Sequence, residues 1–190
     1  MGLFDVLRGK RELKKPASDR LFAMATAYVQ LEGSLGLKTT GSAAIVFQQL
    51  ETADFATLAK DMQELIGATT EEAGTQVETK ADTFGYRWMI LRDSDFEDLV
   101  TGINAISGEL EVGGYGDRIL AAVFPFEDES GKRVYWIYNY KRGAFYPFVP
   151  AGGEQQRDNE RELRLKAQIG PELPLEPELE RWFPLWDIPL

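Results

Sequence analysis

Hydrophobic residues recur along the chain with two spacings, and each spacing predicts one kind of secondary structure. Spacings of three and four residues predict helices with one apolar face, whereas alternation at every second residue predicts strands. The helical spacing covers about residues 18–32, 53–66, 94–112 and 154–168. The stretches that predict strands cover about residues 42–50, 75–83, 86–91, 118–126, 132–140 and 144–149.

The order of these elements predicts the fold class and the organisation of the chain. Short turns between consecutive strands favour an α+β fold with an antiparallel sheet of about five to six strands packed by helices. Pro147 places the last predicted strand at a sheet edge, because proline donates no ladder hydrogen bond. Three regions are expected: a basic amphipathic N-terminal segment (1–17), an α+β domain (18–150), and a C-terminal helix with an apolar Pro- and Trp-rich strap that packs on the same domain (151–190).

The clearest local signal marks the start of the helix predicted near residue 94. Ser94 and Glu97 have the spacing of a capping box, in which the serine hydroxyl binds the backbone N–H three residues on and the glutamate reaches back. Apolar residues at helical spacing follow this signal: Phe96, Leu99, Val100, Ile103, Ile106 and Leu110. We therefore expect the central amphipathic helix of the fold here.

The composition removes several kinds of chemistry. The chain has no cysteine and no histidine, which excludes disulfides, thiolate catalysis, cysteine metal sites and every dyad that uses histidine. Neighbouring acids such as Glu109 with Glu111, or Asp128 with Glu129, are the remaining candidates for acid–base work, but adjacent acids on turns are usually solvated. We predict no catalytic residue, no metal site and no cofactor, and a carboxylate-based hydrolase is the least favoured function.

The charge is unevenly distributed along the chain. The formal net charge is -10, which argues against a nucleic-acid partner, yet residues 1–20 carry six cations and three anions. A short apolar face in this segment is followed by cations, which predicts contact with a membrane surface or a partner, against the alternative of a solvated basic tail. The residues of this candidate site are Leu3, Phe4, Leu7, Arg8, Lys10 and Arg11. No apolar run is long enough for a membrane span and no signal peptide is evident, so we expect a cytoplasmic protein, with peripheral contact at the inner membrane face left open.

Two aromatic segments are candidates for interaction surfaces. The strand predicted at 132–140 is rich in tyrosine, and its outward half would form a face for a protein partner, with Tyr135, Tyr138 and Tyr140 as candidates. The C-terminal segment is too apolar to stay in solvent, so it either binds a partner or straps its own domain, and the second interpretation is favoured. The residues of this strap are Trp182, Phe183, Trp186 and Ile188.

Three stretches of the sequence resemble one protein family. They are the opening residues 1–5 (MGLFD), the block 159–166 (NERELRLK) and the closing residues 180–190 (ERWFPLWDIPL), of which the last is the most specific. Together they are similar to the PspA-associated protein PspAB of bacteria and archaea, and the similarity runs from end to end. The resemblance implies an accessory protein of a PspA-type membrane stress response that binds a PspA-like protein or a membrane protein, and it implies no catalytic residues.

The order of elements has a looser similarity to the type III secretion chaperone-like and YbjN-like folds. That similarity implies a module that holds a partner segment on its sheet and forms a homodimer. The chain departs from this order by the helix predicted at 53–66 and by the C-terminal strap. A non-catalytic stress-response accessory is the first hypothesis, and a chaperone-like module is the alternative.

Overall fold

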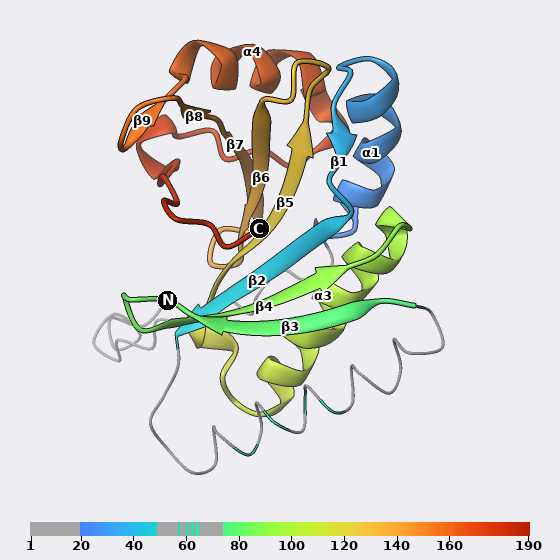
Figure 1. Cartoon of the computed structure of the whole chain (residues 1–190), viewed down its shortest axis with the longest axis vertical. Helices are drawn as coiled ribbons and strands as arrows, with labels where there is room; N and C mark the ends of the chain where they lie inside the picture. Colours follow the sequence, from blue (N-terminus) through green and yellow to red (C-terminus); the bar gives the residue numbers. More distant parts are fainter. Residues whose placement is uncertain (1–19, 49–56, 58–59, 61, 63, 65–73) are drawn as a thin grey trace, which may run out of the picture.

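An antiparallel sheet runs through the molecule in the computed structural model, which describes residues 20–48, 57, 60, 62, 64 and 74–190 (Figure 1). Within these residues the sheet has seven strands in the order β3-β4-β2-β5-β6-β7, and the short β1 also pairs with β5. The strands are β1 (Lys38–Thr39), β2 (Ser42–Gln48), β3 (Gln76–Ala81), β4 (Tyr86–Arg92), β5 (Ile119–Glu127), β6 (Arg133–Asn139) and β7 (Ala144–Phe148).

Helices cover one face of this sheet and one end of it. The longer helices are α1 (Ala23–Gly33), α3 (Phe96–Val112) and α4 (Asn159–Ile169), and the short 3-10 helices are η2 (Gly116–Arg118), η3 (Gly170–Glu172) and η4 (Leu179–Arg181). Figure 1 shows α3 behind the sheet, α1 beside β1, and α4 across the end of β6 and β7. A small hairpin of β8 (Pro150–Ala151) and β9 (Gln156–Arg157) leads into α4.

Both faces of the central strands are buried. On the face covered by helices, Ile45 and Phe47 of β2 pack in the same core as Ile103 of α3. On the opposite face, Val46 and Ile137 belong to a second core that also contains Trp182 of the C-terminal segment. The sheet therefore needs apolar side chains on both sides, which explains why β2 and β6 read as nearly continuous hydrophobic runs.

The α+β class and the predicted order of strands are confirmed, with differences at the ends of elements. The sheet has seven strands rather than about five to six, because the two-residue β1 is too short to leave a sequence pattern. The chain between residues 154 and 158 enters the β8–β9 hairpin, so α4 begins later than predicted. Most of the helix predicted at 53–66 lies outside the described residues, of which Thr57, Lys60, Met62 and Glu64 are helical.

The predicted capping box at Ser94 is wrong by one residue. Asp95 is the N-cap of α3, and its carboxylate accepts a hydrogen bond of 2.8 Å from the backbone N–H of Glu97. The backbone N–H of Asp95 itself donates to the carboxylate of Asp93 at 2.8 Å, which fixes the position of Asp95 at the start of the helix. Aspartate and serine cap helices about equally well, so residue type alone does not separate Ser94 from Asp95.

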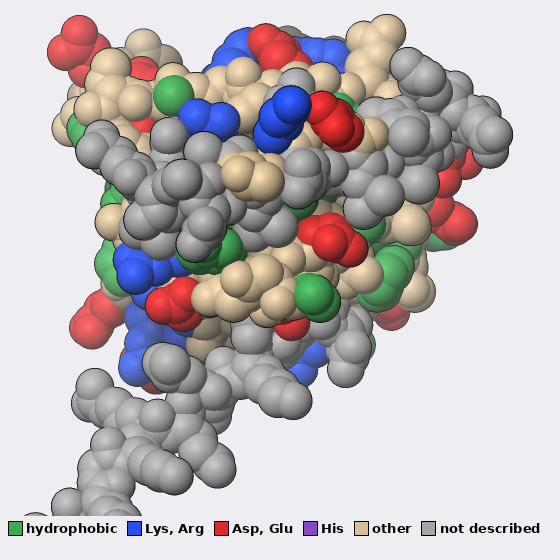
Figure 2. Space-filling model, turned by 90° about the horizontal axis from the view of Figure 1, so that it is seen from below, with side chains coloured by type: hydrophobic (Ala, Val, Ile, Leu, Met, Phe, Trp, Pro, Cys, Tyr) green, Lys and Arg blue, Asp and Glu red, His purple; other side chains and the backbone are tan. Residues whose placement is uncertain are grey.

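Charged and apolar side chains are interspersed over the described part of the surface that is seen from below (Figure 2). Among the described residues, no helix is both long and apolar enough to cross a membrane.

Candidate functional site

Backbone pairing, aromatic contacts and hydrogen bonds hold the C-terminal segment, residues 173–190, against the sheet. We call this segment the strap. The strap first runs beside β7: Leu175 forms a parallel bridge with Phe145. The backbone N–H of Phe145 donates to the carbonyl of Pro174, and the N–H of Glu176 donates to the carbonyl of Phe145, each at 2.8 Å. The start of the strap therefore pairs with the edge of the sheet as an added strand would.

The outer edge of β7 is closed along its length. Backbone N–H and carbonyl groups alternate between the two edges of a strand, so those of Phe145, Pro147 and Val149 are directed away from β6. Phe145 pairs with the strap, Pro147 has no N–H, and the N–H of Val149 donates to a Glu162 carboxylate oxygen at 2.8 Å. The edge position predicted from Pro147 is confirmed by the strand order. A sheet edge covered in this way is not open for pairing with another chain while the strap is in place.

The strap then crosses the face of the sheet that the helices leave uncovered. Trp182 is buried there and stacks on Tyr146, with ring centroids 6.2 Å apart. Its indole N–H donates to the carbonyl of Glu176 at 3.0 Å, so the polar atom of this buried ring has a partner.

The remainder of the strap continues along β7 and β6. Trp186 meets Phe148 edge to face at 5.1 Å between ring centroids. The Tyr146 hydroxyl donates to the carbonyl of Phe183 at 2.9 Å, and the Arg133 guanidinium donates to the main-chain oxygen of Leu190 at 2.6 Å. The strap is thereby tied to the sheet from residue 174 to the last residue of the chain.

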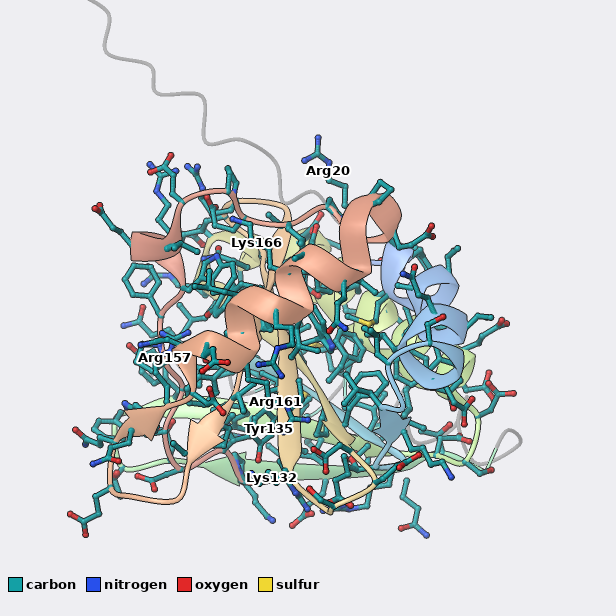
Figure 3. All side chains as sticks on the ribbon, turned by 90° about the horizontal axis from the view of Figure 1, so that it is seen from above. Arg20, Lys132, Tyr135, Arg157, Arg161 and Lys166 are labelled. Atoms are coloured by element: carbon teal, nitrogen blue, oxygen red, sulfur yellow. The ribbon has the colours of Figure 1, made fainter. Side chains whose placement is uncertain are left out.

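A buried ion pair joins α4, the β8–β9 hairpin and the strap. The Arg157 Nη2 lies 2.8 Å from a Glu162 carboxylate oxygen, and Arg157 Nη1 donates to the carbonyl of Trp182 at 2.6 Å. Glu162 is only 1% exposed. Burial raises the pKa of Glu162, while the hydrogen bonds from Arg157 and from the Val149 N–H oppose that rise. Figure 3 shows Arg157 and Arg161 near the beginning of α4 and Lys166 further along it.

A second buried carboxylate fixes the strap where it leaves the sheet edge. Glu176 is 2% exposed and accepts a hydrogen bond from Arg142 Nε at 3.0 Å. Arg181 Nη1 lies 3.8 Å from its other oxygen, which also accepts the N–H of Glu178. Burial alone would raise the pKa of Glu176, but the Glu178 N–H and the two guanidinium groups outweigh it and lower that pKa.

A polar basin lies beside the first turn of α4, with a cavity volume of about 390 Å³. Asp128 lines this basin, and its carboxylate accepts hydrogen bonds from the Ser130 hydroxyl (2.6 Å), the Lys132 N–H (2.9 Å) and the Arg161 guanidinium (2.6 Å). The Ser130 hydroxyl is the largest cause that holds the pKa of Asp128 far below its usual range; burial opposes it, and the Lys132 and Arg161 donors reinforce it. Asp128 therefore links the β5–β6 turn to α4 through these hydrogen bonds.

The tyrosines proposed as a partner face are not exposed. Tyr135 is buried on the strap side of the sheet and stacks on Phe148, with ring centroids 6.1 Å apart. Tyr138 and Tyr140 are buried on the opposite, helix-covered side, where Tyr138 packs on Phe145. The prediction of an exposed tyrosine face is therefore wrong, because both faces of β6 are covered by the chain itself.

The other candidate residues are placed as follows. Trp182 is buried, Trp186 and Ile188 are partly buried against the same core, and Phe183 points away from it with 58% of its surface exposed. The N-terminal candidates lie outside the described residues: Leu3, Phe4, Leu7, Arg8, Lys10 and Arg11. No cluster of acidic side chains in the described ranges has the arrangement of a metal site.

Sequence reasoning missed the two carboxylates that anchor the strap. Glu162 lies in a highly charged helix between Glu160 and Arg164, and no local pattern distinguishes it from its exposed neighbours. Glu176 lies between Leu175 and Pro177, a position that resembles any charged residue in a loop. Only the tertiary fold reveals that both are buried.

These features define a class: an α+β protein in which one antiparallel sheet is covered by helices on one face and by the chain's own C-terminal segment on the other. The chain belongs to the PspAB family, described as PspA associated protein B, whose model matches residues 1–190. Searches of curated proteins and of solved structures returned no match.

Proposed function

We propose that the chain is a non-catalytic, protein-binding accessory of a PspA-type membrane or envelope stress response. The observation that carries this proposal is the family match over residues 1–190, since the family is described by its association with PspA. The partner that follows is a PspA-like protein or a membrane protein at the inner membrane face. Residues 1–17, with their short apolar face and their cations, are proposed to add peripheral contact with that membrane.

The surface around α4 and the strap is a suitable place for the partner to bind. Leu163, Leu179 and Phe183 are large apolar residues that are about half exposed. Lys166 connects α4 to the strap, because its Nζ lies 3.4 Å from the carbonyl of Pro177 and 5.5 Å above the ring of Trp182. Half-exposed apolar side chains on rigid elements supply contact area at little cost in conformational entropy.

Co-purification with a PspA-like protein from the same genome tests the proposal. The full chain, tagged and expressed at its natural level, is expected to recover that protein or a membrane protein, and purified components are expected to bind in a titration. Replacement of Leu163 and Phe183 by serine is expected to weaken binding by at least about tenfold. Replacement of Val29, an exposed apolar residue of α1, by serine is the matched control. Recovery of neither kind of partner would count decisively against the proposal.

The alternative function is a chaperone-like module that holds a partner segment on its sheet. The observation that favours it is the strap itself, an extended segment held by edge pairing and by aromatic contacts on β7. A partner segment that replaced the strap would expose the amide N–H of Glu176 to solvent. Hydrogen exchange at the amides of Phe145 and Glu176 is then expected to accelerate when the partner is added, whereas unchanged exchange would exclude displacement of the strap.

The non-catalytic part of the proposal has its own test. The buried carboxylates Glu162 and Glu176 are each paired with arginine, which suits structural anchoring. Turnover of a small substrate by the purified chain, with loss of turnover after replacement of a single acidic residue, would establish a carboxylate-based hydrolase instead.

A further inference from the structure

The sheet has a second edge, at β3, which is exposed, whereas the edge at β7 is covered by the strap. In the described part of the chain, β3 pairs with β4 alone. Its side chains are exposed or half-exposed along the whole strand, whereas every residue of β7 is buried. A strand edge with unpaired backbone groups is a template for pairing with another strand.

The hydrogen bonds of the β3–β4 turn show which backbone groups face outward. The N–H of Asp82 donates to the carbonyl of Tyr86 at 2.9 Å, so this residue pair is hydrogen-bonded across the hairpin. Because such pairs alternate along an antiparallel ladder, Gln76, Glu78 and Lys80 direct their backbone groups to β4. Val77, Thr79 and Ala81 consequently direct theirs away from the sheet.

We propose that this edge pairs with the same edge of a second copy of the chain, antiparallel, about a two-fold axis at Thr79. In this register Thr79 lies opposite Thr79 of the other copy, and Val77 lies opposite Ala81. Each of these pairs brings together the outward-facing N–H and carbonyl groups, and each exchanges two hydrogen bonds in an antiparallel ladder. Every outward-facing backbone group of β3 then has a partner. The two sheets become one continuous sheet across the axis.

The charged side chains select this register over its neighbours. An axis at Thr79 places Glu78 of each copy opposite Lys80 of the other, and symmetry provides this pair twice. An axis shifted by one residue would place either Glu78 opposite Glu78 or Lys80 opposite Lys80, and like charges directly opposite each other are destabilising. The charges of Glu78 and Lys80 therefore favour the register centred on Thr79 over the two registers next to it.

Both charged side chains are available for this exchange of partners. The side chains of Glu78 and Lys80 are 47% and 40% exposed, and within the chain they form an ion pair with each other at 3.2 Å. Glu78 also lies 3.7 Å from Arg92. Exposed ion pairs of this kind contribute about 1 kcal/mol or less, so they do not hold the side chains away from a second copy.

This inference concerns assembly of the chain with itself and is independent of the proposed PspA-type partner. An interface formed by strand edges alone buries less area than a permanent dimer, so the association is expected to depend on concentration. Sedimentation velocity of the full chain from about 1 µM to about 1 mM is expected to show a monomer–dimer equilibrium. A chain that stays monomeric over this range overturns the inference.

Charge reversal tests the register. Glu78→Lys alone gives the edge two cations, and Lys80→Glu alone gives it two anions, so each variant is expected to dimerise at least about tenfold more weakly. The double variant, with both charges reversed, is expected to recover the dimer. An equimolar mixture of the two single variants is expected to form a mixed dimer, visible by native mass spectrometry. Dimerisation that ignores all of these changes overturns the inference.

Thr79→Pro tests the backbone part. The N–H of Thr79 faces away from β4, so its removal leaves the β3–β4 ladder intact while breaking the central pair of the dimer. We expect this variant to be folded, as judged by circular dichroism, and monomeric, as judged by sedimentation velocity. If the variant does not fold, the charge-reversal variants alone decide the inference. If the chain alone is monomeric and Thr79→Pro instead abolishes binding of a PspA-like protein, the edge belongs to that protein and the self-pairing is wrong.

Discussion

Arg157 and Glu162 form an ion pair at 2.8 Å in which the carboxylate is almost completely shielded from solvent. The same two side chains also satisfy the backbone of two other elements, because Glu162 accepts the N–H of Val149 and Arg157 donates to the carbonyl of Trp182. The pair therefore fastens α4 and the strap to the end of β7. Its energetic importance follows from burial, since a buried charge without a partner is costly.

Removal of one member of this pair is expected to destabilise the fold strongly. Arg157→Met leaves the Glu162 carboxylate buried without its counter-charge, which should lower the free energy of unfolding by about 3 kcal/mol or more at neutral pH. The double variant Arg157→Met with Glu162→Gln removes both charges but keeps an amide oxygen for the Val149 N–H. Urea denaturation should show that the double variant recovers much of the loss, and a double variant as unstable as the single one would contradict this account.

The defect of Arg157→Met is expected to diminish in acid. Burial already raises the pKa of Glu162, and loss of the guanidinium removes an opposing effect, so the pKa rises further in the folded variant. A carboxyl whose pKa is higher in the folded state than in the unfolded state binds protons preferentially when folded. The stability of Arg157→Met relative to wild type should therefore increase as the pH falls from 7 through the raised pKa. Denaturation curves at a series of pH values measure this, and a constant deficit would exclude it.

Asp128→Asn is expected to show the opposite dependence on pH. The donors around Asp128 lower its pKa from an ordinary value of 3.8, so its contribution to stability is complete above that value and is lost as the pH falls below it. At pH 7 the variant should be less stable than wild type by about 1–2 kcal/mol, because the charge-assisted hydrogen bonds to Ser130 and Arg161 are weakened. The two proteins should converge in stability in strong acid. Asp117→Asn, at an exposed ion pair with Arg118, is the control and should change stability by about 0.5 kcal/mol or less.

Trp182 and Phe183 are adjacent in sequence but opposite in burial, which provides a matched test of the strap. Trp182→Ala removes a buried ring and its hydrogen bond to Glu176 and should cost about 3 kcal/mol or more. Phe183→Ala removes an exposed ring, and the carbonyl that accepts the Tyr146 hydroxyl remains, so its cost should stay below about 1 kcal/mol. Hydrogen exchange at the Glu176 amide should accelerate only in Trp182→Ala. Equal effects of the two variants would show that the strap does not pack as described.

The sequence predicted the sheet well because its strands carry strong local patterns. Alternation and apolar runs located the long strands from β2 to β7, and Pro147 located the edge. The same patterns did not show which faces are covered, since the strap residues that share a core with Tyr135 begin at Trp182, more than forty residues further along the chain. The anchors Glu162 and Glu176 were missed for the same reason: burial of a charge depends on partners brought together by the fold. Local pattern therefore predicted the elements, and tertiary packing decided the candidate site.

Two glycines of α3 are expected to respond to the same substitution with opposite signs. A Cβ at Gly102 would overlap with Leu91 Cδ2, because α3 packs closely on β4 at this point. Gly102→Ala therefore forces Leu91 or the helix to move and should cost about 1–3 kcal/mol. At Gly108 nothing lies within 4 Å of the added atom, and alanine favours the helix by up to about 1 kcal/mol over glycine.

The midpoints of urea denaturation compare the two variants directly, since both lie in the same helix and add the same methyl group. Gly102→Ala should unfold at lower urea than wild type and Gly108→Ala at higher urea, with little change in the slope of the transition. Gly102→Ala combined with Leu91→Ala would make room for the new methyl group, so the two substitutions should be less harmful together than the sum of their separate effects. A stabilising Gly102→Ala, or strict additivity with Leu91→Ala, would show that α3 and β4 are not in the close contact described.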